Sequence, residues 1–199
     1  FQIAEEPDAV KERYGIGAQG GGMAQGQGGM RRNPAFAQGC LIARRLVERG
    51  VPFVEVEMGG WDLHQNTHDT LKNNNLPVLD QAMSALIEDL EQRGMLQDTS
   101  VIWMGDFGRT PRINARAGRD HWARCWSTVV AGGGIKGGQA VGATNEDGTQ
   151  VATDPIKSED MMASVLKGLG VSLETTYTSK NNRPMKIANS GKVIKELFA

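Results

Sequence analysis

The sequence is poor in the residues that mark several specialised classes of protein. It has only 2 cysteines in 199 residues, 6% aromatic residues and a formal net charge of -1. A nearly neutral chain gives no electrostatic basis for binding nucleic acid or a membrane surface. No apolar run approaches the length of a membrane span. The remaining composition, 39% hydrophobic and 23% charged, is ordinary, and the length suffices for one domain with a hydrophobic core.

The two cysteines, Cys40 and Cys125, stand far apart in the sequence. One bridge between them is chemically feasible, but the chain shows neither a disulfide framework nor the paired spacing of a metal site. Cys40 falls in a helical pattern, where a free cysteine commonly serves as a small core residue. The chain begins with Phe1 and not with methionine, so we expect a processed protein or a fragment.

Helical and strand-like patterns alternate along the chain. They predict helices over residues 5–14, 36–49, 77–93 and 158–169 and strands over residues 51–57, 99–105 and 127–131. The strand at 99–105 is continuously apolar, which is typical of a strand buried on both faces. Repeated helix–strand units predict an α/β fold with a mainly parallel sheet flanked by helices. We expect one α/β domain over residues 1–199.

A glycine-rich stretch, residues 17–30, interrupts this pattern. It consists of Gly, Ala, Gln and Met, a composition that buries little surface and predicts a flexible inserted loop. It lacks the Lys-Ser/Thr ending of a phosphate-binding loop, and no predicted strand precedes it. We therefore exclude a nucleotide site there.

All three histidines fall in two short motifs. His64 and His68 lie in residues 59–68, after one predicted strand, and His121 lies in residues 118–122, shortly after the next. In parallel sheets ligands bind beyond the carboxyl ends of the strands. We therefore expect both motifs at the same edge of the sheet.

Imidazole and carboxylate groups in these motifs predict a metal site. The candidate ligands are Asp62, His64, Asp106 and His121. His68 and Asp120 are second choices, either as ligands or as residues that orient ligands. Nitrogen and oxygen donors suit Zn²⁺ or Mn²⁺, with Ca²⁺ a further candidate. The alternative is a set of loop-capping aspartates and structural histidines.

Arg109 follows Asp106 in residues 105–111. A guanidinium group can hold phosphate, sulfate or carboxylate through two hydrogen bonds. The alternative is an ion pair with Asp120 that holds a loop. Two tryptophans, Trp103 and Trp126, are expected to pack in the core.

Four motifs, in order, resemble a sulfatase-like bacterial family, DUF1501. They are Gly-Gly-Trp-Asp-Leu-His at 59–64, Gly-Asp-Phe-Gly-Arg-Thr-Pro at 105–111, Gly-Arg-Asp-His-Trp at 118–122 and Ala-Gly-Gly-Gly-Ile-Lys-Gly-Gly at 131–138. That family is similar to the alkaline phosphatase superfamily, whose members use a Ser, Thr or formylglycine nucleophile and one or two metal ions. The resemblance implies that the chain is the C-terminal part of an alkaline-phosphatase-like domain.

The resemblance also implies roles for individual residues. Asp62, His64 and His121 would bind a first metal, and Asp106 would bind a second. Asp106 is followed by Phe107, where the superfamily often has histidine, and the first pair has a narrower spacing than is common. The nucleophile is expected upstream of Phe1. Family members usually carry an export signal, which implies an extracytoplasmic location, either periplasmic or secreted.

These observations together predict a metal-dependent hydrolase of phosphate or sulfate esters. An anionic ester would be its substrate, Arg109 would be the catalytic residue that holds the anionic group, and the metal would stabilise charge on the transferred group. The alternative is a non-catalytic secreted binding or structural protein that retains the scaffold. A third possibility is a metal with a purely structural role.

Overall fold

The computed structural model describes residues 2–17 and 34–198. The chain divides into two compact units. Unit 1 comprises Phe1–Thr99 and Arg112–His121, and unit 2 comprises Ser100–Pro111 and Trp122–Ala199. We describe each unit by itself. The glycine-rich insertion predicted over residues 17–30 lies, apart from Gly17, outside the described residues.

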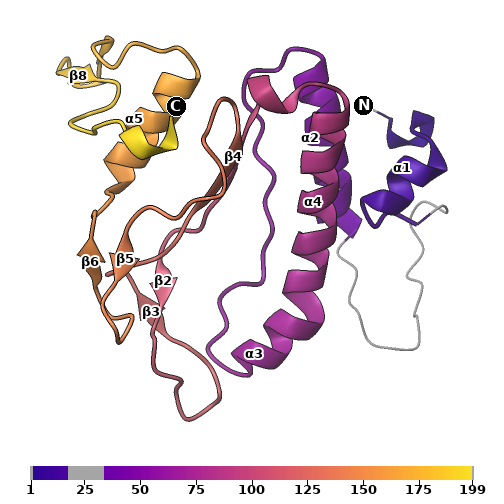
Figure 1. The fold of residues 1–199 in the computed structure, drawn as a ribbon, viewed down its shortest axis with the longest axis horizontal. Helices are drawn as coiled ribbons and strands as arrows, with labels where there is room; N and C mark the ends of the chain where they lie inside the picture. The colour runs from indigo at the N-terminus through magenta and orange to yellow at the C-terminus, as the bar shows by residue number, and fades with distance from the viewer. Residues whose placement is uncertain (1, 18–33, 199) are drawn as a thin grey trace. The chain divides into compact units, whose positions relative to one another are not determined.

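Unit 1 is built from helices. Its elements are η1 (Ile3–Glu5), α1 (Asp8–Arg13), α2 (Pro34–Glu48), α3 (Thr67–Thr70), the π-helical η2 (Leu71–Asn75), α4 (Leu76–Gln92) and η3 (Leu96–Asp98). Helices α2 and α4 lie side by side (Figure 1). The predicted helices over residues 5–14, 36–49 and 77–93 are confirmed as α1, α2 and α4. Within the described part of the chain, no helix has both the length and the apolar content needed to cross a bilayer.

The core of unit 1 lies between α2, α4 and the N-terminal segment. Its buried members are Tyr14, Ile16, Phe36, Ala37, Cys40, Leu41, Leu79, Ala82 and Ala85. Leu79 and Leu90 of α4 are buried, whereas Leu76 is 44% exposed. The small side chains of Ala82 and Ala85 on the buried face of α4 allow α2 and α4 to approach closely. The free thiol of Cys40 is buried as expected, and this burial raises its pKa to about 12.

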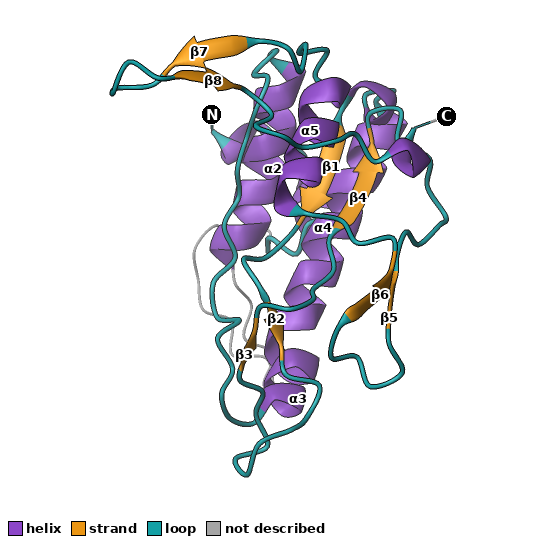
Figure 2. Ribbon diagram, turned by 90° about the vertical axis from the view of Figure 1, so that its left-hand side faces the viewer, coloured by secondary structure: helices purple, strands orange, loops and turns teal. Residues whose placement is uncertain are grey.

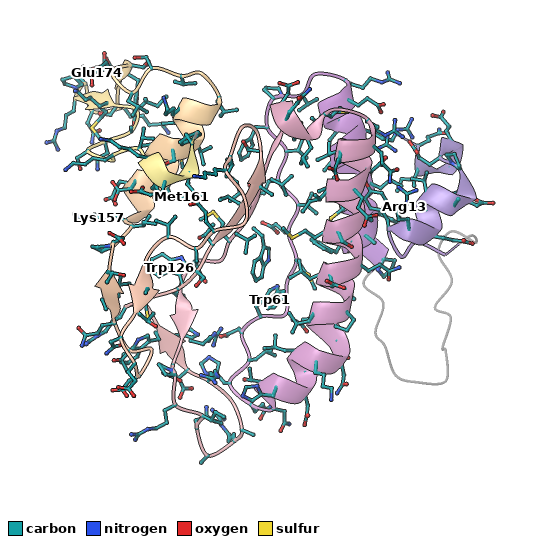
Figure 3. The ribbon with its side chains drawn as sticks, viewed as in Figure 1. Arg13, Trp61, Trp126, Lys157, Met161 and Glu174 are labelled. Carbon is teal, nitrogen blue, oxygen red and sulfur yellow. The ribbon has the colours of Figure 1, made fainter. Side chains whose placement is uncertain are left out.

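A buried ion-pair network joins the same elements. Arg44 is 1% exposed and donates from Nε to Asp89 Oδ2 at 2.8 Å and from Nη2 to Glu6 Oε2 at 2.7 Å. The Tyr14 hydroxyl also donates to Asp89, at 3.1 Å. Every charge of the network has a partner, so the desolvation cost of burial is offset by charge-assisted hydrogen bonds. Arg13, labelled in Figure 3, adds a hydrogen bond of 2.9 Å from α1 to Gln92 of α4.

Helices α2 and α4 end in the same way, at a glycine. Gly50 and Gly94 have φ values of 82° and 68°, a left-handed conformation that glycine adopts without steric cost. After Gly94, Met95 N–H donates to Leu90 O at 2.8 Å, and Gly94 N–H donates to Glu91 O at 2.9 Å. This is the Schellman arrangement, and it closes the helix predicted over residues 77–93.

The strand predicted over residues 51–57 is not confirmed, because these residues have no regular secondary structure. Val56 of this segment and Met58, just after it, pack against the helical core. A Cβ on Gly39 would lie 2.7 Å from Val56 Cγ1, so glycine at this point of α2 makes room for the segment. The prediction of a strand was therefore wrong, although the segment does pack against the helices of unit 1.

Unit 2 carries nearly all of the strands. They are β1 (Ser100–Trp103), β2 (Gly108–Arg109), β4 (Val129–Gly132), β5 (Ala143–Thr144), β6 (Val151–Thr153), β7 (Thr176–Thr178) and β8 (Pro184–Lys186), with helix α5 (Ser158–Gly168) and η4 (Lys195–Leu197). Strand β3 (His121–Trp122) lies where the chain passes from unit 1 to unit 2. Figure 2 shows β1 beside β4.

The predicted fold class, a mainly parallel sheet flanked by helices, is wrong. The described strands form two-stranded sheets, and β1–β4, β5–β6 and β7–β8 are antiparallel. The strand predicted at 99–105 pairs with the one predicted at 127–131, with Trp103 opposite Val129. Local patterns indicate that a segment is extended, but pairing and direction depend on which segments meet.

The sheet β1–β4 is also not buried on both faces. Trp103 is 36% exposed, and Trp126, which we also expected in the core, is 44% exposed. Helix α5 packs over the sheet, and a small apolar pocket there is lined by Ile102, Val130 and Met161 among others, the last labelled in Figure 3. The continuously apolar sequence at residues 99–105 therefore belongs to a strand with only one covered face.

Candidate metal centre

Three side chains of unit 1 bring their donor atoms together. His121 Nε2 lies 2.8 Å from Asp62 Oδ1, His64 Nε2 lies 3.0 Å from the same oxygen, and the two Nε2 atoms are 3.1 Å apart. The imidazole centroids are 4.8 Å apart. We call Asp62, His64 and His121 the triad. Each residue of the triad offers one potential ligand atom, and these atoms lie close enough together to hold one metal ion.

The triad draws on two separate stretches of chain. Asp62 and His64 follow the extended segment that carries Trp61 (labelled in Figure 3), whose side chain packs against the helical core. His121 arrives on the returning loop, residues 112–121, which belongs to unit 1 although β1 and β2 intervene in sequence. Fifty-odd residues of sequence thus separate the ligands that the fold brings together.

A buried asparagine holds the segment before Asp62. Asn75 ends the π-helical turn η2, and its Nδ2 donates to Gly60 O at 2.8 Å. Gly60 has φ 89°, which favours glycine at this bend. The wider helical turn precedes Pro77, whose ring conflicts with the carbonyl four residues earlier in a regular α-helix. Pro77 thus accounts for the π-helical turn, and this turn places the Asn75 side chain next to Gly60.

The returning loop docks on the backbone around His64. Asn66 N–H donates to Arg116 O at 3.1 Å, and Thr67 N–H donates to Ala117 O at 2.9 Å. Gly118 is buried against the His64 carbonyl group, where a Cβ would collide with backbone atoms. The loop therefore requires glycine at this position to bring His121 to the triad.

Asp120 fixes the orientation of His64. Its Oδ1 lies 2.8 Å from His64 Nδ1. A carboxylate only accepts hydrogen bonds, so Nδ1 carries a proton, and in a neutral imidazole this leaves the lone pair on Nε2. The hydrogen bond from His64, together with one from Asn114, holds the pKa of Asp120 below its usual range.

The donor atoms of the triad fit a divalent cation. With both imidazoles neutral, His64 Nε2 and Asp62 Oδ1 are acceptors, and only His121 Nε2 can hold a proton among the three contacts. In that protonation state, the lone pairs of His64 Nε2 and Asp62 Oδ1 face each other at 3.0 Å. A cation bound between these atoms removes the repulsion. Two imidazole nitrogens and one carboxylate oxygen form a donor set that binds Zn²⁺, Mn²⁺ or Fe²⁺.

The other predicted site residues are not members of the triad. His68 is exposed on α3, and His64 precedes that helix, so the two do not share a helical face. Asp106 and Arg109 belong to unit 2. Asp106 Oδ1 accepts from Phe107 N–H at 2.9 Å, and the Arg109 guanidinium lies 5.8 Å from the Phe107 ring centroid. Their predicted roles as second-metal ligand and anion-binding residue stay predictions.

Sequence reasoning missed Asn114 and Asn75. Asn114 Oδ1 accepts from the N–H groups of Arg116 and Gly118, both at 2.9 Å. Asparagine before a glycine-containing loop is typical of such turns, so this signal was present in residues 114–118. Asn75 had no comparable signal, because its function depends on a π-helical turn and on a carbonyl fifteen residues earlier.

Comparison with known proteins gives one family. The family described as "Protein of unknown function (DUF1501)" matches residues 1–198, and the chain belongs to it. No curated protein and no solved structure matches the chain. The family membership expected from the four motifs is thus confirmed.

Proposed function

We propose that the protein binds a divalent metal ion through the triad and uses it to hydrolyse phosphate or sulfate esters. The observation that carries the metal site is the convergence of three donor atoms, from two stretches of sequence, at distances of 2.8–3.1 Å. The resemblance of the motifs to the alkaline phosphatase superfamily supports the choice of reaction.

The environment of the triad suits an accessible reaction centre. The side chains of Asp62, His64 and His121 are 68%, 35% and 51% exposed. An ester can therefore reach the donor atoms from solvent. When bound, the metal supplies positive charge that stabilises the ester oxygens during transfer. The triad residues hold the ion, and Asp120 keeps His64 oriented towards it.

The donor set also ranks the candidate metals. Ca²⁺ prefers six to eight oxygen ligands, whereas the triad offers two nitrogens and one oxygen. We therefore expect Zn²⁺ and Mn²⁺ to bind well and Ca²⁺ to bind weakly. Isothermal titration of the metal-free protein with each ion measures this order.

The histidines provide a matched test. His64→Ala and His121→Ala should abolish stoichiometric metal binding, measured by elemental analysis after dialysis, because each removes one of three ligands. His68→Ala is the control, since it deletes an exposed imidazole outside the triad. Equal metal content in all three variants would contradict the proposed site.

Activity is tested separately, with aryl phosphates and aryl sulfates and a metal-loaded protein that includes the segment upstream of Phe1 in which the nucleophile is expected. We expect turnover that both triad substitutions remove and that His68→Ala leaves unchanged. Metal binding without turnover would refute the hydrolase and favour a non-catalytic secreted protein. Unfolding on chelation, with no activity to lose, would indicate a structural metal.

A further inference from the structure

The two ring nitrogens of His64 face different partners. Nε2 points to the other triad atoms, 3.0 Å from Asp62 Oδ1, while Nδ1 lies 2.8 Å from Asp120 Oδ1. Only the tautomer protonated at Nδ1 satisfies the second contact with a neutral imidazole. The same tautomer presents the Nε2 lone pair that a metal requires.

Asp120 is itself held by Asn114. Asn114 Nδ2 donates to Asp120 Oδ1 at 3.2 Å and to the His64 carbonyl at 3.1 Å. The amide cannot be turned over, because its Oδ1 already accepts from the N–H groups of Arg116 and Gly118. Asn114 therefore ties the carboxylate, the backbone of His64 and its own loop into one unit.

The arrangement couples the two metal-binding histidines. Asp120 immediately precedes His121, so the returning loop supplies one ligand and the residue that orients the other. Backbone hydrogen bonds dock this loop next to His64, including Arg119 N–H to Leu63 O at 3.2 Å. The loop that docks beside His64 therefore also carries the carboxylate that orients its imidazole.

We propose that Asp120 and Asn114 are positioning residues, which fix His64 in the tautomer that leaves its Nε2 lone pair available to a metal ion. The inference rests on the proposed metal site and adds two residues that do not touch the metal. A hydrogen-bonded carboxylate behind a histidine ligand orients the ring and raises its basicity, and its loss typically weakens metal binding about 10–100-fold.

The first experiment uses nitrogen-15 NMR of the histidine side chains in the metal-free, full-length chain at a pH where imidazole is neutral. In the wild type, His64 should show a protonated Nδ1 and a bare Nε2. Asp120→Ala should shift the proton towards Nε2, and Asn114→Ala should do so to a smaller extent. An unchanged His64 tautomer in Asp120→Ala would overturn the proposal.

The second experiment titrates Zn²⁺ and Mn²⁺ into the same proteins. Asp120→Ala should weaken binding about 10–100-fold, and the isosteric Asp120→Asn should weaken it less, because an amide oxygen still accepts from Nδ1. Asp69→Asn is the control, since it removes an equal charge from an exposed position of the neighbouring helix α3. Wild-type affinity in Asp120→Ala would overturn the positioning role.

The outcomes separate the two proposals. A wild type that binds no metal would refute the proposed function, while the NMR experiment would still decide what Asp120 does to His64. Metal binding that depends on His64 but not on Asp120 would refute the positioning role alone. Circular dichroism of each variant identifies loss of fold, and Asp120→Asn, which keeps the side-chain shape, then provides the deciding measurement.

Discussion

Unit 1 and unit 2 differ in how they bury their apolar residues. The nine-membered buried cluster of the described chain lies wholly in unit 1, between helices and the extended segment. Unit 2 has two-stranded sheets and exposes large apolar side chains such as Trp126, Met162 and Tyr177. The triad lies on the unit with the dense core. Side chains that converge on one point must be held in place, and rigid packing behind them provides this.

The largest expected difference concerns the loss of unfolding free energy when an ion pair is broken in unit 1 or in unit 2. Asp89→Ala leaves the buried Arg44 without one partner and should cost about 3–5 kcal/mol of unfolding free energy. Glu174→Ala breaks the exposed pair with Lys186, 2.6 Å long in unit 2, and should cost less than about 1 kcal/mol. Urea denaturation followed by circular dichroism measures both. Equal costs would contradict the difference in burial.

Core packing gives the next contrast. Leu41 is 0% exposed, and Leu41→Ala should destabilise the fold by about 2–5 kcal/mol, because it removes buried methyl groups and leaves a cavity. Met162 of α5 is 54% exposed, and Met162→Ala should change the stability by about 0.5 kcal/mol or less. A large effect of Met162→Ala in the same denaturation experiment would show that unit 2 has a covered face there.

Acid should affect the two units unequally. Burial raises the pKa of Asp89, but the hydrogen bond from Arg93 and the charge of Arg44 outweigh it, so the net pKa is lowered. A lowered folded-state pKa stabilises the fold above the unfolded value of about 3.9, and this contribution is lost as the pH falls through the folded-state pKa. The stability difference between wild type and Asp89→Asn should be constant near neutral pH and shrink below about pH 4.

Asp160 in unit 2 is the comparison for this pH effect. Backbone hydrogen bonds from Lys192 and Lys157 lower its pKa, but Asp160 is less buried than Asp89. Asp160→Asn should therefore show the same sign with a smaller amplitude, since solvent screens the interaction. If the pH-dependent change in stability were equally large for both aspartates, burial of Asp89 would not strengthen its interactions.

The smallest perturbation is chemical labelling of the cysteines. Cys40 of unit 1 is 3% exposed and its pKa is raised to about 12, so it should not react with iodoacetamide in the folded protein. Cys125 of unit 2 is half-buried, and its thiol donates to Gly148 O at 3.3 Å. Mass spectrometry should find Cys125 labelled first and Cys40 only after denaturant is added. Equal labelling rates would show that the unit 1 core opens readily.

Prediction from sequence succeeded where the signal is local. The helices predicted over residues 36–49 and 77–93 end at Gly50 and Gly94, which adopt the left-handed conformation. The prediction of a parallel sheet failed, because residues 99–105 and 127–131 do not encode whether they pair as parallel or antiparallel strands. Of the four candidate ligands, Asp62, His64 and His121 converge, whereas Asp106 belongs to the other unit.

By itself, the sequence determined the helices, their ends, the family and the two histidine motifs, because each depends on residues only a few positions apart. Only the tertiary structure decided that residues 112–121 return to unit 1, and that Asp120 and Asn114 hold His64 from behind. The physical reason is that hydrogen bonds across fifty residues depend on where the folded chain passes, and no local pattern of side chains specifies that path.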